Sequence, residues 1–360
     1  MIWKKISPSI IAKYYNGNHR VTLFSDGTKL KETINPDDDH FTYEFPESFD
    51  LKITDYCDGG CKFCAENSTT NGKHANLSNI HDLMDSCKKG TEVAIGGGNA
   101  LAHPDIVNFV YYLRSLDIIP SITVNQAHLK PYYEVLMDVK KANIAGVGIS
   151  LTDPNNFEDF RIIDKLGDNA VIHVIAGILK PSDYKALYGR KVLILGYKDF
   201  RRGHDNLLRH SDEIKKNIEQ LKKDLPMLVD KCRAISFDCL GLEQIDPKTV
   251  LGISDEEFAK IYQGDDYDMY DKDGNISVGS MFIDAVRMEV ARSSTTPLEK
   301  RVPFTGKEYI GDLLRETCFV YSENNNEKTD EDLLKVINKG IKQYKVDRKK
   351  KDLENDFQGI

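Results

Sequence analysis

An alternation between apolar runs of strand length and amphipathic segments of helical length, from Phe49 to about Gln244, constrains the fold of this chain more than any other feature. Near-continuous apolar strands that alternate with helices are typical of a parallel sheet with crossover helices. Six or seven such units fit a full or partial (β/α) barrel, and an open, doubly wound sheet is the alternative, because periodicity alone cannot close a barrel. The runs are FDLKITDYC (49–57), EVAIGGGN (92–99), IIPSITVNQ (118–126), AGVGISL (145–151), AVIHVIAGI (170–178), KVLILGYK (191–198) and AISFDCLGL (234–242).

The segments on either side of this alternation have different patterns. Residues 1–48 contain two hairpin-type turns, Asn16-Gly17 and Asp26-Gly27, between short β-prone runs, and we expect a small antiparallel meander there. We therefore divide the chain into this meander and three further parts. These are a barrel over residues 49–245, a C-terminal α/β extension over 246–322 and a charged helix over 323–360.

The extension contains one apolar segment that could complete the barrel. Residues 279–296 read as a strand followed by a helix or a second strand, and Phe282, Val286 and Val290 lie at helical spacing. A barrel of six or seven strands is open at its side. We expect this segment to pack there, close the mouth of the site and select the substrate, with the polar run from Arg292 to Thr295 facing a ligand.

Composition excludes several classes of protein. The 360-residue chain has a formal net charge of -8, which argues against an extended basic surface for nucleic acid. The N-terminus lacks the apolar run of a secretory signal, and no segment approaches the roughly 20 apolar residues of a membrane span. We therefore expect a cytoplasmic protein without membrane contact, whose seven cysteines bind metal or react rather than form disulfides.

Three of the cysteines, Cys57, Cys61 and Cys64, cluster at a C-x₃-C-x₂-C spacing directly after the first strand of the predicted barrel. Loops at the C-terminal ends of the strands build the active sites of parallel α/β barrels. A zinc site would need a fourth ligand, for which His74 or His81 is available. Three thiolates on a [4Fe–4S] cluster would instead leave one iron open to a substrate or cofactor.

The spacing of the three cysteines, with the aromatic Phe63 just before the last one, resembles the cluster motif of the radical S-adenosylmethionine (radical SAM) superfamily. In that superfamily the cofactor's methionine moiety chelates the open iron, and reductive cleavage gives a 5′-deoxyadenosyl radical that abstracts a substrate hydrogen. The resemblance therefore implies an enzyme with a [4Fe–4S] cluster on Cys57, Cys61 and Cys64 and with S-adenosylmethionine as cofactor. The cofactor carries the difficult chemistry, and the protein orients it.

Three further strand ends resemble motifs of the same superfamily. The stretch GGGNALAHPD (96–105) is similar to its Gly-Gly-Glu-Pro motif, whose backbone holds the methionine amino group, although Gly98 and Asn99 replace the usual acidic residue and proline. Asn125 is the candidate contact for the ribose or the methionine carboxylate, since an amide both donates and accepts hydrogen bonds. Ser150 resembles the strand-end serine of many members.

The sixth strand and the loop after it, VLILGYKDFRRG, would lie beside the adenine in that architecture. Gly196 would permit close approach of a ring. The basic residues Lys198, Arg201 and Arg202 would meet a carboxylate or phosphate, or form an exposed basic loop. His173 would either face the barrel lumen or be a satisfied core histidine, and we favour the core. The candidate cofactor contacts are Phe63, Gly96, Gly97, Gly98, Asn125, Ser150, Gly196 and Lys198.

The sequence leaves the substrate open between a peptide or protein side chain and a nucleoside or nucleotide. The partners implied are that substrate and an electron donor such as flavodoxin or ferredoxin. No auxiliary cluster is expected, because Cys87, Cys232, Cys239 and Cys318 repeat no tight ligand spacing. The alternative function is a non-enzymatic protein with a zinc or iron–sulfur site on an α/β scaffold.

Overall fold

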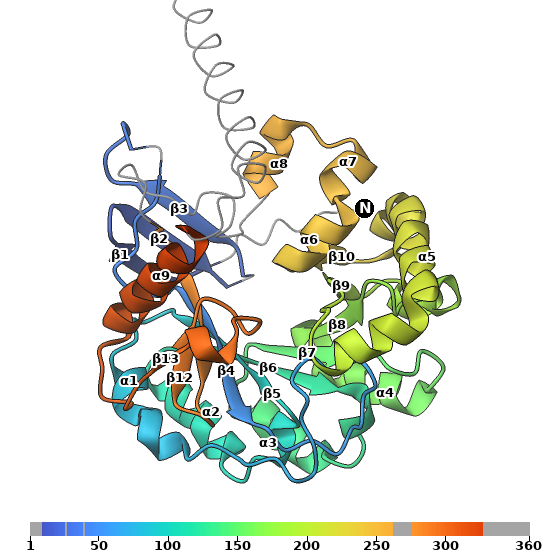
Figure 1. The fold of residues 1–360 in the computed structure, drawn as a ribbon, viewed down its shortest axis with the longest axis horizontal. Coiled ribbons are helices and arrows are strands. Elements are labelled where there is room, and N and C mark those ends of the chain that lie inside the picture. The colour runs from blue at the N-terminus through green and yellow to red at the C-terminus, as the bar shows by residue number, and fades with distance from the viewer. Residues whose placement is uncertain (1–8, 26, 39, 262–275, 327–360) are drawn as a thin grey trace, which may run out of the picture. The chain divides into compact units, whose positions relative to one another are not determined.

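A ten-stranded sheet forms the core of the computed structural model, which describes residues 9–25, 27–38, 40–261 and 276–326 (Figure 1). Each of the seven predicted runs contains one strand, and strands consecutive in the chain pair in parallel. The predicted α/β fold with a partial barrel is confirmed. The seven strands are β4 (Ser48–Thr54), β5 (Glu92–Gly97), β6 (Ile119–Asn125), β7 (Gly146–Ser150), β8 (Ala170–Ile175), β9 (Lys191–Leu195) and β10 (Ala234–Phe237).

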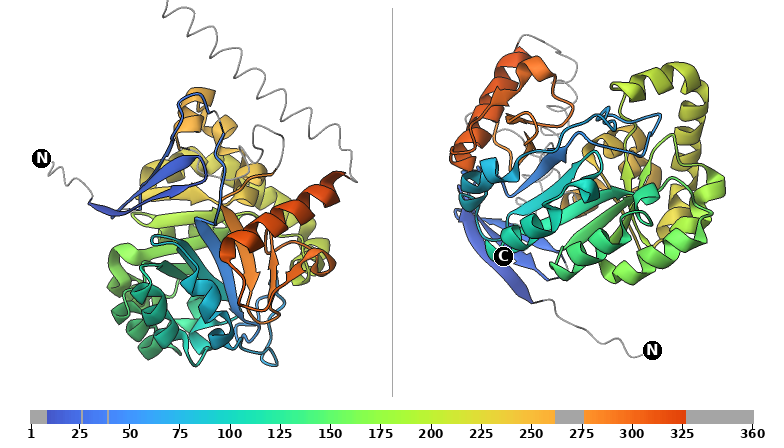
Figure 2. Two further views of the ribbon diagram at one scale, coloured as in Figure 1. Left: turned by 90° about the vertical axis from the view of Figure 1, so that its left-hand side faces the viewer. Right: turned by 90° about the horizontal axis from the view of Figure 1, so that it is seen from below.

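Helices connect these strands and cover the outer face of the curved sheet, as Figures 1 and 2 show for α2 to α5. No helix in the described part of the chain is long and apolar enough to cross a membrane. The α-helices are α1 (His81–Asp85), α2 (Ile106–Ser115), α3 (Tyr133–Lys141), α4 (Phe157–Leu166), α5 (Arg202–Lys231), α6 (Cys239–Ile245), α7 (Pro247–Leu251), α8 (Asp255–Ile261) and α9 (Ile310–Asn326). The 3₁₀ helices are η1 (Leu77–Ile80), η2 (Ala100–Ala102), η3 (Gln126–His128), η4 (Gly167–Asn169), η5 (Pro181–Leu187) and η7 (Leu298–Lys300).

The two faces of the parallel sheet differ in burial. Residues that point toward the helices are fully buried and branched, such as Val93, Ile122, Val147, Ile172 and Val192. Their neighbours on the inner face are mostly half-buried, although they lie in the middle of a wide sheet. A solvent-accessible inner face follows, lined largely by small or polar side chains. These half-buried residues include Ala94, Ser121, Thr123, Gly146, Ser150, Val171, His173 and Leu193.

The sheet does not end with the predicted barrel at residue 245. Strand β11 (Ser280–Asp284) pairs in parallel with β4, and β12 (Glu289–Ala291) and β13 (Val302–Pro303) continue it in antiparallel fashion. Residues 279–296 therefore form a strand and a second strand, and the helix suggested by the spacing of Phe282, Val286 and Val290 is wrong. Burial explains the difference, because Phe282 and Ile283 are both buried, one on each face of the sheet, and no helical stripe forms.

The N-terminal segment forms the expected antiparallel meander, a three-stranded sheet in the order β1-β2-β3. The turn at Asn16-Gly17 lies where the sequence placed it, and Gly17 takes a φ of 56° with no room for a Cβ beside the Thr42 carbonyl. Asp26, in the second expected turn, lies outside the described residues. The strands are β1 (Ile10–Asn16), β2 (His19–Phe24) and β3 (Lys29–Thr33).

One buried carboxylate joins this meander to the start of β4. The Glu47 side chain is 2% exposed and lies 2.7 Å from His19 Nε2 and 2.9 Å from Lys31 Nζ. Burial alone would raise its pKa, but the hydrogen bond with His19 and the charges of Lys31 and Lys29 lower the pKa of Glu47 to about 2. Glu47 is therefore ionised and held close to His19 and Lys31 in the folded protein.

The chain divides into two compact units, residues 1–318 and 319–360. In the first unit, the start of α9 is anchored by Ile310, whose backbone N–H donates to Ser86 Oγ at 3.1 Å, and by the buried Leu313 and Leu314. The second unit is described only for residues 319–326, the end of α9. Most of the charged helix predicted over 323–360 thus lies outside the described residues.

Candidate functional site

The three clustered cysteines lie on the loop that leaves β4, and all three are half-buried free thiols. Backbone hydrogen bonds hold this loop, among them one from Cys57 N–H to the Thr69 carbonyl at 2.9 Å. Burial raises the pKa of Cys57 and Cys61, and the proximity of Cys64 raises both further. Only thiolates ligate metals, so three thiols in this setting need a strong positive partner to ionise together. An iron–sulfur cluster fits this donor set.

The spacing of the sulfurs does not fit a single zinc ion. In the described part of the chain, the one group of three His, Cys, Asp or Glu ligand atoms within 4.8 Å of one another is Cys57, Asp58 and His128. Cys57, Cys61 and Cys64 are therefore not gathered to that distance. Thiolates on one tetrahedral zinc would lie about 3.8 Å apart, given a Zn–S bond of about 2.3 Å. A larger inorganic group suits the three cysteines better.

The two histidines considered as a fourth zinc ligand have other partners. His74 Nδ1 lies 2.8 Å from Thr54 Oγ1, and its ring packs on Tyr56. The His81 ring stacks on Tyr112 with ring centroids 4.3 Å apart. Neither supports the zinc alternative.

The glycine stretch after β5 packs against the cysteine loop. Gly98 N–H donates to the Thr54 carbonyl at 2.8 Å, and a Cβ on Gly98 would stand 2.1 Å from the Tyr56 carbonyl. Gly97 has a φ of 112° and an equally close approach to Thr54. The position that is usually acidic in the superfamily motif therefore has no room for a side chain here. Gly96 differs, because a Cβ there would meet no atom within 4 Å.

Asp58, the residue after the first cysteine, is held from three directions. Asn99 Nδ2 donates to Asp58 Oδ1 at 3.0 Å, Tyr132 donates to Oδ2 at 2.9 Å, and His128 Nε2 lies 3.0 Å from Oδ1. Burial would raise the pKa of Asp58, but the hydrogen bonds from Asn99 and Tyr132 lower it. Sequence reasoning gave these residues no role. Their positions after neighbouring strands were the available signal, because such ends meet at one edge of a sheet.

Asn125, at the end of β6, contacts the cysteine loop directly. Its Nδ2 lies 3.4 Å from Cys61 Sγ, and its Oδ1 accepts from Ala127 N–H at 2.9 Å. Ser150 stands beside Asn125 in the sheet register, on the inner face. The structure thus brings both predicted polar residues to the cysteine side of the inner face. Their contact with the cofactor stays a prediction.

His173 is on the inner face, which was the alternative interpretation, and it is not the satisfied core histidine that we favoured. It is the register neighbour of Ser150, and its ring occupies the space above Gly148, where a Cβ would stand 2.2 Å from Cε1. Burial lowers the pKa of His173 to about 4, so the ring is neutral. Its Nδ1 has no hydrogen-bond partner among the described residues.

Gly196, expected beside an adenine ring, has a different use in the structure. A Cβ at Gly196 would stand 2.4 Å from Leu240 Cγ, and its N–H donates to Asp238 Oδ1 at 2.8 Å. Asp238 also caps α6 by accepting from Gly241 N–H. The close approach that glycine permits here is to helix α6, which fills the space expected for a ring.

The basic residues after β9 are half-buried, and each donates a hydrogen bond within the protein. Arg201 donates to the Glu66 carbonyl at 2.9 Å, and Arg202 donates to the Ser68 carbonyl at 2.6 Å. Lys198 Nζ donates to Ser294 Oγ of the C-terminal extension at 3.1 Å. The two arginines thus fix the loop that carries the cysteines. Phe63, also on this loop, is half-buried.

A buried lysine ties the same loop to β4 and β11. The Lys52 side chain is 3% exposed, and its Nζ lies 2.6 Å from Asp55, 3.0 Å from Glu66 and 3.5 Å from Asp284. Burial would lower the pKa of Lys52, but the charges of Glu66 and Asp284 raise it. Asp284 also lies 3.4 Å from Arg301. Sequence reasoning missed this network, because Asp284 and Arg301 are far from Lys52 in the chain.

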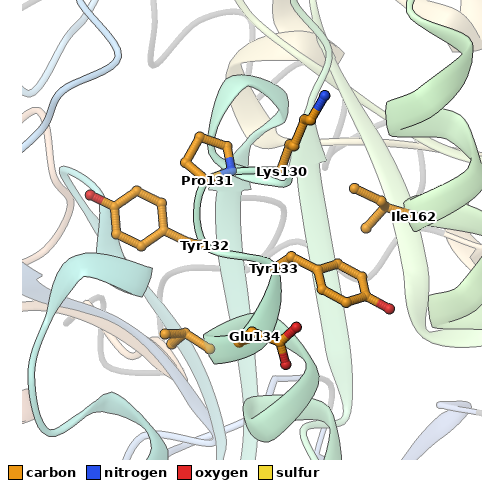
Figure 3. Close-up of a pocket in the computed structure, with 7 residues that line it drawn as sticks. Lys130, Pro131, Tyr132, Tyr133, Glu134 and Ile162 are labelled. Carbon is orange, nitrogen blue, oxygen red and sulfur yellow. The ribbon is translucent and has the colours of Figure 1, made fainter.

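A surface pocket of about 450 Å³ lies at the start of α3 (Figure 3). Tyr132 and Tyr133 point in opposite directions there, and each has a structural partner: Asp58 for Tyr132, and Lys165 Nζ, 3.0 Å away, for Tyr133. We assign no ligand to this pocket. Its residues are Lys130, Pro131, Tyr132, Tyr133, Glu134, Val135 and Ile162.

Residues 51–224 match the family model described as the radical SAM superfamily. These residues form a radical SAM domain. The cofactors that go with this domain are a [4Fe–4S] cluster and S-adenosylmethionine. The predicted family, fold and cofactors are confirmed, and the assignment of individual ligands stays a prediction.

Solved radical SAM structures share the fold at low sequence identity. Streptococcus suis SuiB bound to precursor peptide SuiA is 15% identical with a TM-score of 0.51, over 76% of this chain and 65% of that one. The chain thus spans 65% of the length of SuiB. The structure titled anSMEcpe with bound AdoMet and Cp18Cys peptide is 12% identical with a TM-score of 0.48, over 74% and 80% of the two chains. No curated protein matches the chain.

Proposed function

We propose that this radical SAM enzyme removes a hydrogen atom from a peptide or protein side chain, with its cluster held by Cys57, Cys61 and Cys64. The observation that carries the substrate class is the shared fold with SuiB, whose structure contains a precursor peptide. The inner face of the sheet is accessible to solvent and is lined largely by small or polar side chains, which supports a substrate as large as a peptide. When bound, the cluster and S-adenosylmethionine supply reductive cleavage of the sulfonium and a carbon-centred radical.

The chain's own residues hold and orient these groups. The thiolates of Cys57, Cys61 and Cys64 would bind three irons and leave the fourth for S-adenosylmethionine. A Cβ at Gly96 would meet no neighbouring atom, so a ligand can approach the backbone at this end of β5. Asn125 and Ser150 offer polar side chains on the same inner face. Helices on the outer face keep the opposite side of the strands dry.

A nucleotide substrate is less well supported. The basic residues proposed for a phosphate, Arg201 and Arg202, bind carbonyls of the cysteine loop, and Lys198 binds Ser294. These contacts give all three side chains a structural role in the free protein. The cluster also needs a one-electron donor, and we propose a flavodoxin or ferredoxin for that role.

The substrate class is tested with anaerobically reconstituted full-length enzyme, S-adenosylmethionine and dithionite. We expect 5′-deoxyadenosine formation to rise when synthetic peptides are added and to stay at its basal rate with nucleosides or nucleotides. Peptides labelled with deuterium should transfer the label to 5′-deoxyadenosine. Transfer from a deuterated nucleoside and from no peptide would overturn the peptide assignment while leaving the enzyme class intact.

A further inference from the structure

One carboxylate on the inner face stands without a partner. Asp50 lies in the middle of β4, between Phe49 and Leu51, which are buried on the outer face. Its register neighbours are Ala94 on β5 and Phe282 on β11. The Asp50 side chain is exposed, and within the described residues its carboxylate forms no hydrogen bond or ion pair.

A carboxylate without a partner is unusual at the position of Asp50, in the middle of a strand. Solvent reaches the side chain, yet protein surrounds it, as happens to a group inside a concave sheet. Burial raises the pKa of Asp50, Lys198 opposes the rise, and Glu66 and Asp238 add to it. A charge that costs folding energy and has no structural partner is typical of a group kept for a ligand.

The nearby cations are already engaged. Lys52 serves Asp55, Glu66 and Asp284, and Lys198 is held by Ser294. Ser294 is neutral and does not offset the charge of Lys198, so Lys198 attracts Asp50, whereas the two carboxylates Glu66 and Asp238 repel it. A positively charged group placed at Asp50 would offset the repulsion from its acidic neighbours, whereas an anion would add to it.

We propose that Asp50 binds a cationic group of the substrate, an ammonium or guanidinium such as a lysine or arginine side chain carries. The proposal rests on the peptide function above and names the chemistry that the site selects. An ionised carboxylate accepts hydrogen bonds only, and it pairs with guanidinium and ammonium groups through charge-assisted bonds. Ala94 is small, so the β5 side of Asp50 leaves space for such a group.

Two cations compete for this assignment, because S-adenosylmethionine itself carries an ammonium and a sulfonium. The glycine stretch and the cysteine loop lie at the C-terminal ends of β4 and β5, beyond Thr54 and Gly97. Asp50 lies four residues before Thr54, on the same strand. At about 3.3 Å per residue, that separation is roughly 13 Å along the strand. The substrate is therefore the better occupant, and the experiment separates the two.

The test uses reconstituted holoenzyme saturated with S-adenosylmethionine, and butylammonium and butyrate as probes in saturation-transfer NMR. Asp50→Asn removes the charge and keeps the shape, and Asp50→Glu keeps the charge. Asp230→Asn, an exposed carboxylate on α5, is the matched control. We expect butylammonium to bind wild type and Asp50→Glu, and to bind Asp50→Asn about tenfold more weakly, which is the order of one charge-assisted hydrogen bond. Butyrate should not bind, and Asp230→Asn should behave as wild type.

Three results would overturn the proposal. Equal butylammonium binding by wild type and Asp50→Asn would show that the carboxylate is not the binding group. Binding of butyrate at the same site would show that the site does not select a cation. Loss of S-adenosylmethionine binding in Asp50→Asn, with iron retained, would assign Asp50 to the cofactor instead.

A peptide comparison then connects the site to turnover. Peptides that differ only by lysine or norleucine at one position should differ in how far they raise 5′-deoxyadenosine formation by wild type, and the difference should vanish in Asp50→Asn. Persistence of the difference in Asp50→Asn would overturn the assignment of the lysine side chain to Asp50. Failure of all peptides would remove the proposed function, while the butylammonium result would still decide the charge selectivity of Asp50.

Discussion

The loop that carries the cysteines and the inner face of the sheet share the same strands but are built in opposite ways. On the loop, the charged groups have partners: Asp58 has three neighbours, and Arg201 and Arg202 hold backbone carbonyls, although Ser68 Oγ and Arg202 Nε have no hydrogen-bond partner among the described residues. On the inner face, Asp50 and His173 Nδ1 have no hydrogen-bond partner within the described residues. The loop must keep fixed positions for a cluster, whereas the inner face leaves its polar groups for ligands to satisfy.

The largest expected effect breaks the loop itself. Cys61→Ala should abolish [4Fe–4S] reconstitution, because two thiolates cannot hold a cluster with one open iron. Iron content and the visible absorbance of anaerobically reconstituted protein measure this. Cys239→Ala is the control, since Cys239 is exposed at the start of α6, and it should reconstitute fully. Iron retained in Cys61→Ala and lost in Cys239→Ala would reverse the assignment of the ligands.

A second prediction concerns a partnered carboxylate away from the loop. Glu47→Gln should destabilise the protein at pH 7, because Lys31 loses its charge partner and Lys29 loses one of its two carboxylate neighbours. The folded pKa of about 2 lies below the ordinary 4.5, so the stabilisation is present above pH 4.5 and is lost as pH falls toward 2. The shift corresponds to about 3 kcal/mol at pH 7, as an order of magnitude.

Urea denaturation at pH 7 and pH 3 measures this effect. The difference between wild type and Glu47→Gln should shrink at the lower pH. Glu32→Gln is the control in the same meander, because its pair with Arg20 is exposed and should contribute less than about 1 kcal/mol. A constant difference across the pH range would show that Glu47 acts through packing and not through its charge.

The sequence predicted the parallel strands and the cysteine loop because both depend on local patterns. Apolar runs mark buried strands, and the C-x₃-C-x₂-C spacing is contiguous. The secondary structure of residues 279–296 could not be predicted from a local pattern. Phe282 and Val290 fit a helix as well as two strands, and the pairing of β11 with β4 decided between them across more than 200 residues of chain.

The candidate site divides in a similar manner. Strand-end motifs selected Asn125 and Ser150, and the sheet register places the two side by side at the ends of β6 and β7. The role of Gly196 depends on its close contact with Leu240. The role of Arg201 depends on its hydrogen bonds to carbonyls of the cysteine loop. Such contacts join segments far apart in the chain, and residue type alone does not reveal them.

The smallest expected effect is a gain in stability, opposite in sign to the loss expected for Glu47→Gln. It is the most direct test of the contrast between the cysteine loop and the inner face. The pKa of Asp50 is raised in the folded protein, so its ionised form opposes folding at neutral pH, and this cost grows as pH rises through the folded pKa. Asp50→Asn should therefore stabilise the protein slightly at pH 7, by less than about 1 kcal/mol because solvent screens the exposed group. The gain should disappear at pH 3, where wild-type Asp50 is largely protonated.

Thermal unfolding at the two pH values measures the difference. Lys198, Glu66 and Asp238 surround the carboxylate in both proteins, so the difference isolates the charge of Asp50. A loss of stability at pH 7 would show that Asp50 has a stabilising partner and is built like Glu47, and the contrast between the two regions would then fail at its most informative residue.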